Sequence, residues 1–216
     1  KKLLLILLCL PMIGFGQQTY VPDNNFEAYL EANGMGNGVP NDDYVTTANI
    51  NTITSLNVGS QNISDLTGIE AFTALTTLYC DDNQLTSLDV SQNTALTRLS
   101  CDNNQLTSLD VSQNLALIEL FCGGNQLTNL DVSTNLALII LLCQNNPNLT
   151  CINVDDVTYS TTNWTNIDPQ HYFSTNCPPP SAIQEHTTNK ELLKVTDLLG
   201  RETKQTNQPL FYIYDD

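Results

Sequence analysis

The chain has 216 residues and a formal net charge of −16, and its length fits one or two domains. Between Gln17 and Pro180 a single basic residue, Arg98, stands against seventeen acidic residues. Such a surface repels phosphate backbones and anionic lipid, which excludes nucleic acid as a partner. The acidity serves solubility alone, or it attracts a cationic ligand or divalent cations.

The first residues have the pattern of a secretory signal peptide. Lys1 and Lys2 precede an apolar run, and small residues follow at Gly14 and Gly16. The run is too short to span a bilayer, and no other segment is apolar enough to do so. We expect residues 1–16 to be the signal peptide, so that the mature chain is secreted or attached to the outer cell surface.

Residues 17–50 form a predicted N-terminal cap that does not follow the repeat pattern of the later chain. The run Pro22-Asp-Asn-Asn25 precedes an apolar periodic segment at residues 26–30, which predicts a short capped helix. We expect the apolar side of this helix to close the first turn of the repeats. A loop rich in glycine, asparagine and aspartate follows at residues 34–43.

A repeat of 21 residues dominates residues 51–150, and it is the strongest signal in the chain. Its unit reads L-x-x-L-x-C-x-x-N-x-L-x-x-L-D-V-S-x-N-x-A. An earlier, looser turn has Val58 at the position that later turns fill with cysteine. The repeated cysteines are Cys80, Cys101, Cys122 and Cys143.

Each unit predicts one short strand followed by a turn. The last three residues of L-x-x-L-x-C alternate in direction, so that Leu78 and Cys80 point inward and Tyr79 points outward. The asparagine three residues after each cysteine can bond the backbone of the bend, and stacked copies would form a ladder. One unit cannot bury enough apolar surface to be stable alone, so the turns must stack.

This pattern resembles bacterial leucine-rich-repeat proteins, particularly the repeats with cysteine and asparagine of flavobacterial secreted proteins. The resemblance covers about residues 20–177. The residues at the two ends predict a short helical N-terminal cap and, after a last strand at residues 149–152, an irregular C-terminal cap within residues 151–177. The resemblance implies a leucine-rich-repeat solenoid of short parallel β-strands with little helix. It also implies an interaction protein and not an enzyme. Consistently, His171 and His186 both lie outside the repeats, and we find no catalytic set, metal cluster or phosphate loop.

The C-terminal segment changes in character. Residues 178–189 start with three prolines and form a predicted linker. Two strand-like runs, at residues 192–199 and 210–214, flank a polar turn. With the run Leu199-Gly-Arg-Glu202 they resemble the C-terminal sorting domain of the type IX secretion system of Bacteroidetes. Because members of that family continue further, we expect residues 190–216 to be a truncated fragment of a β sorting domain.

The cysteines outside the signal peptide fall into two classes. In stacked parallel strands, equivalent residues lie about 4.8 Å apart, whereas a disulfide needs converging Cβ atoms about 3.8 Å apart. We therefore expect the repeated cysteines to be buried free thiols that act as small hydrophobic residues. Cys151 and Cys177 flank the C-terminal cap, and we predict a disulfide between them. Closing this loop of about 26 residues would stabilise the fold by about 3.5 kcal/mol.

Outward-facing strand positions stack into columns, and several of these positions are apolar although the fold does not require it. We interpret them as part of a binding surface. The alternatives are that repeat strands tolerate scattered apolar residues, or that the C-terminal cap covers the last two of them. The predicted ligand-binding face consists of Tyr79, Arg98, Glu119, Phe121, Ile140 and Leu142.

Another column, of Asp89, Asp110 and Asp131, is a candidate calcium site, because carboxylates are calcium ligands. The acidic loop at residues 41–43 is a weaker one. The column can equally accept hydrogen bonds from nearby serines, and the sequence lacks a dedicated calcium loop. We therefore predict no metal and no cofactor.

The sequence favours a monomeric extracellular or cell-surface binding module that recognises a protein or glycan through the face of its repeat strands. The alternative is a structural or adhesive spacer of the cell surface without a discrete ligand. Neither function requires catalysis.

Overall fold

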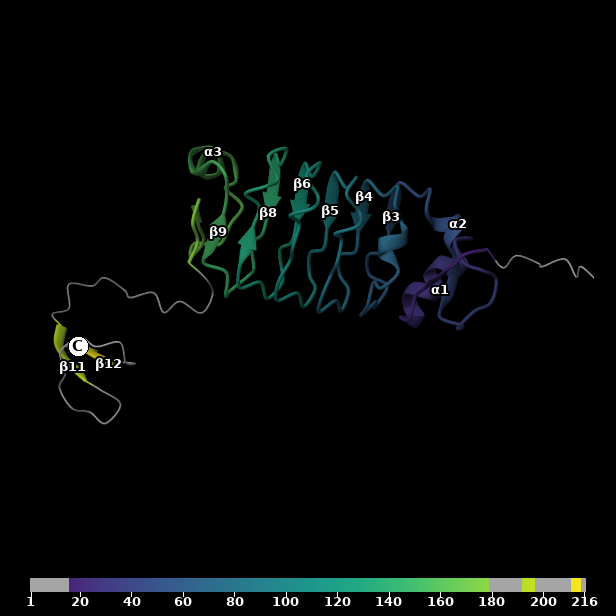
Figure 1. Ribbon diagram of the computed structural model, residues 1–216, viewed down its shortest axis with the longest axis horizontal. Helices are drawn as coiled ribbons and strands as arrows, with labels where there is room; N and C mark the ends of the chain where they lie inside the picture. The colour runs from purple at the N-terminus through teal and green to yellow at the C-terminus, as the bar shows by residue number, and fades with distance from the viewer. Residues whose placement is uncertain (1–15, 179–191, 197–210, 215–216) are drawn as a thin grey trace, which may run out of the picture. The chain divides into compact units, whose positions relative to one another are not determined.

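The computed structural model describes residues 16–178, 192–196 and 211–214 (Figure 1). The chain divides into two units between Pro180 and Ser181. In the second unit, β11 (Leu192–Thr196) pairs antiparallel with β12 (Phe211–Tyr214). The predicted signal peptide, apart from Gly16, and the predicted linker, apart from Pro178, lie outside the described residues.

The repeats of the first unit stack into a solenoid, and the fold class predicted from the sequence is confirmed (Figure 1). Its main sheet, within the described residues, has the parallel order β3-β4-β5-β6-β8. From β4 onward each strand residue pairs with the residue 21 positions later, as in Thr77 with Arg98 and Glu119 with Ile140. The strands are β3 (Ser55–Asn57), β4 (Thr77–Tyr79), β5 (Arg98–Ser100), β6 (Glu119–Phe121) and β8 (Ile140–Leu142).

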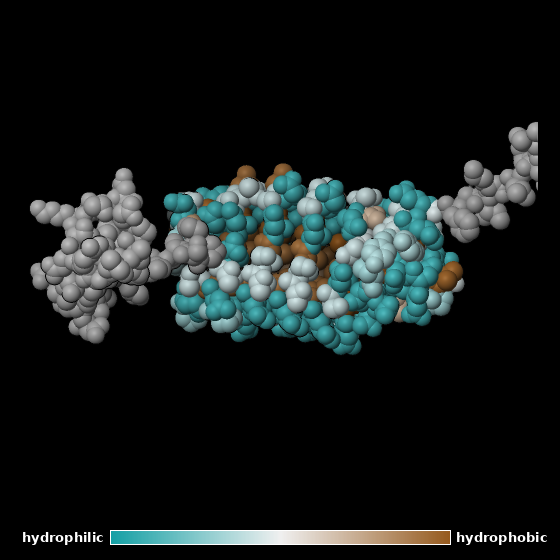
Figure 2. Space-filling model, turned by 60° about the horizontal axis from the view of Figure 1, so that its bottom comes forward, coloured by the Kyte–Doolittle hydropathy of each residue, from teal (hydrophilic) through white to brown (hydrophobic). Residues whose placement is uncertain are grey.

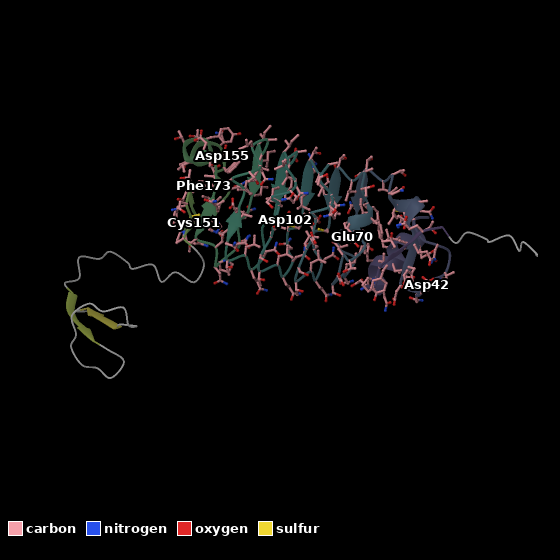
Figure 3. The ribbon with its side chains drawn as sticks, in the orientation of Figure 1. Asp42, Glu70, Asp102, Cys151, Asp155 and Phe173 are labelled. Atoms are coloured by element: carbon pink, nitrogen blue, oxygen red, sulfur yellow. A yellow bond between two sulfur atoms is a disulfide. The ribbon has the colours of Figure 1, made fainter. Side chains whose placement is uncertain are left out.

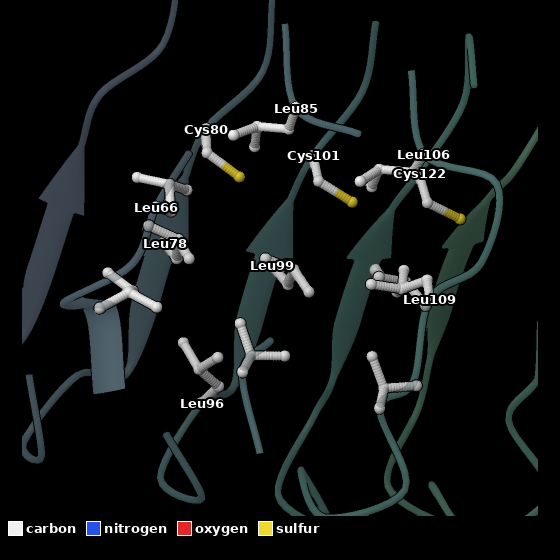
Figure 4. Close-up of a cluster of buried hydrophobic side chains, with 14 of the residues drawn as sticks. Leu66, Leu78, Cys80, Leu85, Leu96, Leu99, Cys101, Leu106, Leu109 and Cys122 are labelled. Atoms are coloured by element: carbon white, nitrogen blue, oxygen red, sulfur yellow. The ribbon is translucent and has the colours of Figure 1, made fainter. Parts of the chain in front are cut away.

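Leucine and cysteine side chains fill the space behind this sheet. Cys80, Cys101 and Cys122 lie one behind another along successive turns (Figure 4). These three cysteines and Cys143, the fourth of the repeated cysteines, are buried and free, as predicted. Their parallel orientation follows from the parallel register, because equivalent strand residues project in the same direction.

The predicted asparagine ladder closes the bend after each strand. The Nδ2 group of Asn104 donates to the carbonyl oxygens of Cys80 (3.0 Å) and Cys101 (3.1 Å). Its Oδ1 atom accepts from the backbone N–H of Leu85 (3.0 Å). One side chain thus satisfies backbone groups of two successive turns, which would otherwise be buried without partners. The other members of this ladder are Asn83, Asn125 and Asn146.

A second asparagine ladder, which the sequence analysis did not identify, lies at the opposite bend. Asn114 Nδ2 donates to the carbonyl oxygens of Val90 and Asn93, both at 3.0 Å. Asn135 repeats the arrangement one turn later with Val111 and Asn114. The last asparagine of the repeat unit is therefore a structural residue as well.

The opposite wall of the solenoid is less regular. It contains β7 (Leu130–Asp131), β9 (Cys151–Asn153) and β10 (Tyr172–Ser174), which pair in parallel in the order β10-β9-β7. The strand at Cys151 therefore continues this wall and not the main sheet. Isolated bridges extend the same wall to Asp110 and Asp89.

The N-terminal cap contains the predicted helix. α1 (Asn24–Ala32) is capped by Asp23, whose side chain accepts from the backbone N–H groups of Asn25 and Phe26. Phe26 and Leu30 are fully buried, and the Phe26 ring stacks with that of Phe72 in the first turn. Elements that were not predicted complete the region: antiparallel β1 (Gln18–Tyr20) and β2 (Tyr44–Thr46), α2 (Thr47–Ile50) and the 3-10 turn Ile69–Ala71.

The C-terminal cap is more ordered than expected. The segment after β9, predicted to be irregular, contains α3 (Val157–Asn163) and β10, so this prediction was wrong. The sequence of α3 has no apolar period; the side chain of Asp156 caps it by accepting from Tyr159 N–H. The predicted disulfide between Cys151 and Cys177 is present, with a Cα–Cα distance of 5.7 Å. Figure 3 shows Cys151 and Phe173 together at this end of the solenoid.

Candidate binding face

The outward side chains of β4, β5, β6 and β8 form one surface, which we call the strand face. The parallel register brings Glu119 beside Ile140, and Phe121 beside Leu142. Ile140 is 38% exposed, so the C-terminal cap does not cover it. Tyr79, Phe121 and Leu142 are half-buried. The apolar residues predicted for this face therefore remain at least partly accessible.

Arg98 connects the polar members of the predicted face. Its Nη1 donates to the hydroxyl of Tyr79 (2.8 Å), and its Nη2 lies 2.6 Å from Glu119 Oε2. The hydrogen bond to Tyr79, followed by that to Glu119, raises the pKa of Arg98. The three residues come from three successive strands, which the 21-residue register places side by side. A shallow hollow of about 360 Å³ lies over them.

A second hollow, of about 490 Å³, lies where the strands end, and its lining is mostly polar, with three aspartates among it. Asp81, Asp82 and Asp102 line it (Asp102 is labelled in Figure 3). Burial, opposed by hydrogen bonds that include one from Gly123 N–H, raises the pKa of Asp102. Gly123 makes this contact possible, because a Cβ there would lie 2.9 Å from the carbonyl oxygen of Gln144.

The structure places a histidine against the last repeated cysteine, which the sequence analysis did not foresee. His171 Nδ1 lies 3.9 Å from Cys143 Sγ, and His171 Nε2 lies 3.4 Å from Asp168 Oδ2. His171 lies outside the repeats along the chain but contacts them in space, because the C-terminal cap folds back onto the last turn. His186 lies outside the described residues.

This group of residues lacks the properties of a catalytic site. The His171 side chain is fully buried, as is Cys143, so a substrate has no access to either. Burial, followed by the charge of Asp168, raises the pKa of Cys143 to about 12. A thiol with this pKa is not ionised near neutral pH and is a poor nucleophile.

The aspartate column of the opposite wall is explained by local hydrogen bonds. Asp89, Asp110 and Asp131 each accept, through Oδ1, the backbone N–H of the serine two residues later, at 2.9 Å in every turn. These bonds are the alternative to calcium binding that the neighbouring serines offered in the sequence. Among the described residues, no three His, Cys, Asp or Glu side chains are placed to hold a metal ion. In the same part of the chain, no helix is long and apolar enough to cross a membrane.

Exposed aliphatic side chains also lie beside the strand face, outside the predicted set. They precede β6 and β8, and Figure 2 shows brown side chains protruding along one edge of the solenoid. Comparing the repeats position by position would have found them, since earlier turns carry threonine there. These residues are Leu115, Ile118, Leu136 and Ile139.

Comparison with known proteins agrees with this architecture. A family model for leucine-rich repeats, in two copies, matches residues 73–116. The fold is a leucine-rich-repeat solenoid. Internalin J of Listeria monocytogenes serotype 4b (strain F2365) is 42% identical over 74 residues, which are 34% of this chain and 8% of that protein. The match thus spans only a small part of this relative.

Solved structures of Listeria monocytogenes internalins are similar as well. The functional domain of InlJ, described as including a cysteine ladder, is 35% identical, with 64% of this chain and 38% of that chain covered and a TM-score of 0.45. The internalin InlF is 21% identical, with 71% of this chain and 56% of that chain covered and a TM-score of 0.50.

Proposed function

We propose that this chain is an extracellular or cell-surface module that recognises a protein through the strand face. The observation that carries the proposal is the combination, on one open sheet face, of accessible apolar side chains with the linked group of Tyr79, Arg98 and Glu119. Apolar residues surrounding a few fixed polar groups are typical of protein interfaces. The leucine-rich-repeat fold and the partial similarity to internalin J support the same function.

The apolar side chains favour a protein over a glycan, which was the other ligand class predicted from the sequence. Phe121, Ile140 and Leu142 offer no hydrogen-bonding groups to sugar hydroxyls, and Ile140 is 38% exposed. The burial of Cys143 and His171 supports a module without enzymatic activity.

The proposed localisation rests on the segments at the two ends of the sequence. Residues 1–16 would direct secretion as a signal peptide. Residues 190–216, which resemble a fragment of a type IX sorting domain of Bacteroidetes, support secretion or attachment to the outer cell surface. The antiparallel pair of β11 and β12 is compatible with this part of the proposal. Residues 17–50 and 151–177 would act as caps, and residues 178–189 as the linker.

A double substitution tests the strand face. Tyr79→Ser with Phe121→Ser keeps the fold, because Ser100 already occupies the position between them in the same column. The full chain is immobilised and its binding to extracellular proteins from the surroundings of the cell that produces it is measured by biolayer interferometry. We expect the variant to lose the saturable binding that the wild type shows. The matched control, Thr86→Ala with Thr107→Ala, changes exposed residues on the opposite side of the solenoid and should bind normally.

The spacer function predicts a different result. A spacer would show no saturable partner, and sedimentation velocity would instead show self-association that increases with protein concentration. Binding that persists in the Tyr79→Ser and Phe121→Ser variant would show that the strand face is not the recognition surface.

A further inference from the structure

An aliphatic ridge, consisting of Leu115, Ile118, Leu136 and Ile139, borders the strand face at the start of β6 and β8. These side chains are 61%, 38%, 74% and 59% exposed, respectively. Exposed apolar side chains that gather on adjacent turns are unusual on a soluble protein and mark interaction surfaces.

The ridge is continuous across two turns. Asn135 Nδ2 donates to the carbonyl oxygen of Asn114 (3.0 Å), which places Leu136 beside Leu115. The backbone N–H of Ile139 donates to the carbonyl oxygen of Ile118 (2.8 Å), which places the two isoleucines at equivalent positions of adjacent turns. The four exposed side chains therefore lie on the same two adjacent turns, with each leucine three residues before the isoleucine of its turn.

The repeats themselves show that the fold does not require this surface. Thr73 and Thr94 occupy the position of the two leucines in earlier turns, and Thr76 and Thr97 occupy that of the two isoleucines. The Thr97 hydroxyl donates to the carbonyl oxygen of Thr76 (3.0 Å). Isoleucine cannot make this bond, so the later turns lose a hydrogen bond and expose apolar area to water. Burial against a partner would offset both costs.

The cap beside the ridge adds apolar surface and negative charge. Trp164 Nε1 donates to the carbonyl oxygen of Ile139 (2.9 Å), which fixes the segment around α3 against the last ridge residue. Tyr159, which is 41% exposed, contacts the Trp164 ring. Asp155 and Asp156 precede α3, and Asp155 is labelled beside it in Figure 3.

The charge of the protein surface distinguishes between the molecules that could cover the ridge. Between Gly16 and Pro178 the only lysine or arginine is Arg98, and Glu119 compensates its charge. A membrane with anionic lipid would be repelled by this surface, and so would a second copy of the same acidic chain. A partner that is apolar where it meets the ridge and basic around it would be attracted.

We propose that the aliphatic ridge docks an amphipathic, cationic segment of the partner protein. This inference rests on the proposed function and identifies the chemistry of the partner. The apolar side of the segment covers Leu115, Ile118, Leu136 and Ile139, and its lysine or arginine residues lie over the surrounding acidic surface.

The repeats supply the variant that tests this proposal. The substitutions Leu115→Thr, Ile118→Thr, Leu136→Thr and Ile139→Thr give the later turns the residues of the earlier ones, without changing the charge. Thermal unfolding should show that this variant remains folded. The probe is an 18-residue amphipathic peptide of leucine and lysine, whose binding to the full chain is followed by fluorescence anisotropy. Control peptides replace lysine by glutamate, or leucine by serine.

We expect saturable binding of the leucine–lysine peptide, weakened about tenfold or more in the four-threonine variant, a loss typical of central interface residues. Both control peptides should bind about tenfold more weakly as well, because each lacks one part of the recognition. Raising the salt concentration should weaken binding, since part of the attraction is electrostatic.

Several results would overturn the inference while leaving the proposed function intact. One is equal binding of the peptide by the wild type and the four-threonine variant. A second is equal binding of the leucine–glutamate peptide, which would refute a cationic partner. A third is self-association, or flotation with vesicles containing phosphatidylglycerol, that the four threonines abolish. Loss of protein binding in the Tyr79→Ser and Phe121→Ser variant tests the proposed function separately.

Discussion

Asn104→Ala is the substitution that most directly tests how the turns are held together. Asn104 is 7% exposed and donates to the carbonyl oxygens of Cys80, Cys101 and Asp102 at 3.0, 3.1 and 3.2 Å. Its Oδ1 atom accepts the backbone N–H of Leu85 at 3.0 Å. Alanine removes all of these bonds and leaves the N–H of Leu85 buried without this partner.

The expected loss follows from these contacts. The two amide hydrogens, shared among the three carbonyl oxygens, contribute about 1 kcal/mol each, and an unsatisfied buried N–H costs about 1–3 kcal/mol, so the free energy of unfolding should fall by about 4 kcal/mol. With a urea m-value of about 2 kcal/mol/M, the unfolding midpoint should move down by about 2 M. Circular dichroism during urea titration measures this shift.

The neighbouring substitution Gln105→Ala is the matched control. Gln105 is exposed, and its hydrogen bond to the carbonyl oxygen of Leu85 uses only its backbone N–H, which alanine retains. Its effect should stay within about 0.5 kcal/mol. If Asn104→Ala lost less than about 1 kcal/mol, the asparagine ladder would not have the stabilising role that its contacts indicate.

Three further outcomes are expected. Cys151→Ser with Cys177→Ser should lower the free energy of unfolding by about 3.5 kcal/mol. Reduction should destabilise the wild type similarly but leave this variant unchanged; a reducing agent that shifts neither would contradict a stabilising disulfide. Burial would raise the pKa of Asp23, but hydrogen bonds from Ser64 and Phe26 dominate and lower it below the ordinary 3.8. Its contribution is therefore complete above about pH 4 and lost as pH falls through the folded pKa. Asp23→Ala should destabilise the wild type at pH 7 by about 1–2 kcal/mol and make unfolding between pH 4 and 2 less acid-sensitive. An unchanged acid transition would refute this role of the Asp23 carboxylate. The repeated cysteines should resist alkylation at pH 8 in the folded chain and react after unfolding, as peptide mass spectrometry would show; labelling before unfolding would contradict their burial.

The repeat made the core predictable. A strict 21-residue period leaves one stacking register, and that register determines that Leu78 and Cys80 point inward and Tyr79 outward. It also separates the two classes of cysteine, because parallel stacked side chains do not converge whereas Cys151 and Cys177 lie outside the register. The asparagine ladder followed from the same argument.

The caps were less predictable, because they do not repeat. The pairing of β1 with β2 joins residues far apart in the chain, and α3 depends on the Asp156 cap and on the packing of Trp164 without an apolar period. Such elements form because they cover the ends of the core, which a local pattern does not show. The missed aliphatic ridge is a different case, since it is visible in the sequence when equivalent positions are aligned.

The sequence alone thus determined the solenoid, its inward residues, the free thiols and the disulfide. The reason is that a periodic chain can bury its apolar side chains and pair its buried backbone groups in only one stacked arrangement. Only the tertiary structure decided how side chains from different turns meet: Arg98 with Tyr79 and Glu119, and His171 with Cys143. It also decided which apolar residues stay exposed, because exposure depends on how far the C-terminal cap reaches over the last turns. The cap leaves Ile140 and the aliphatic ridge uncovered.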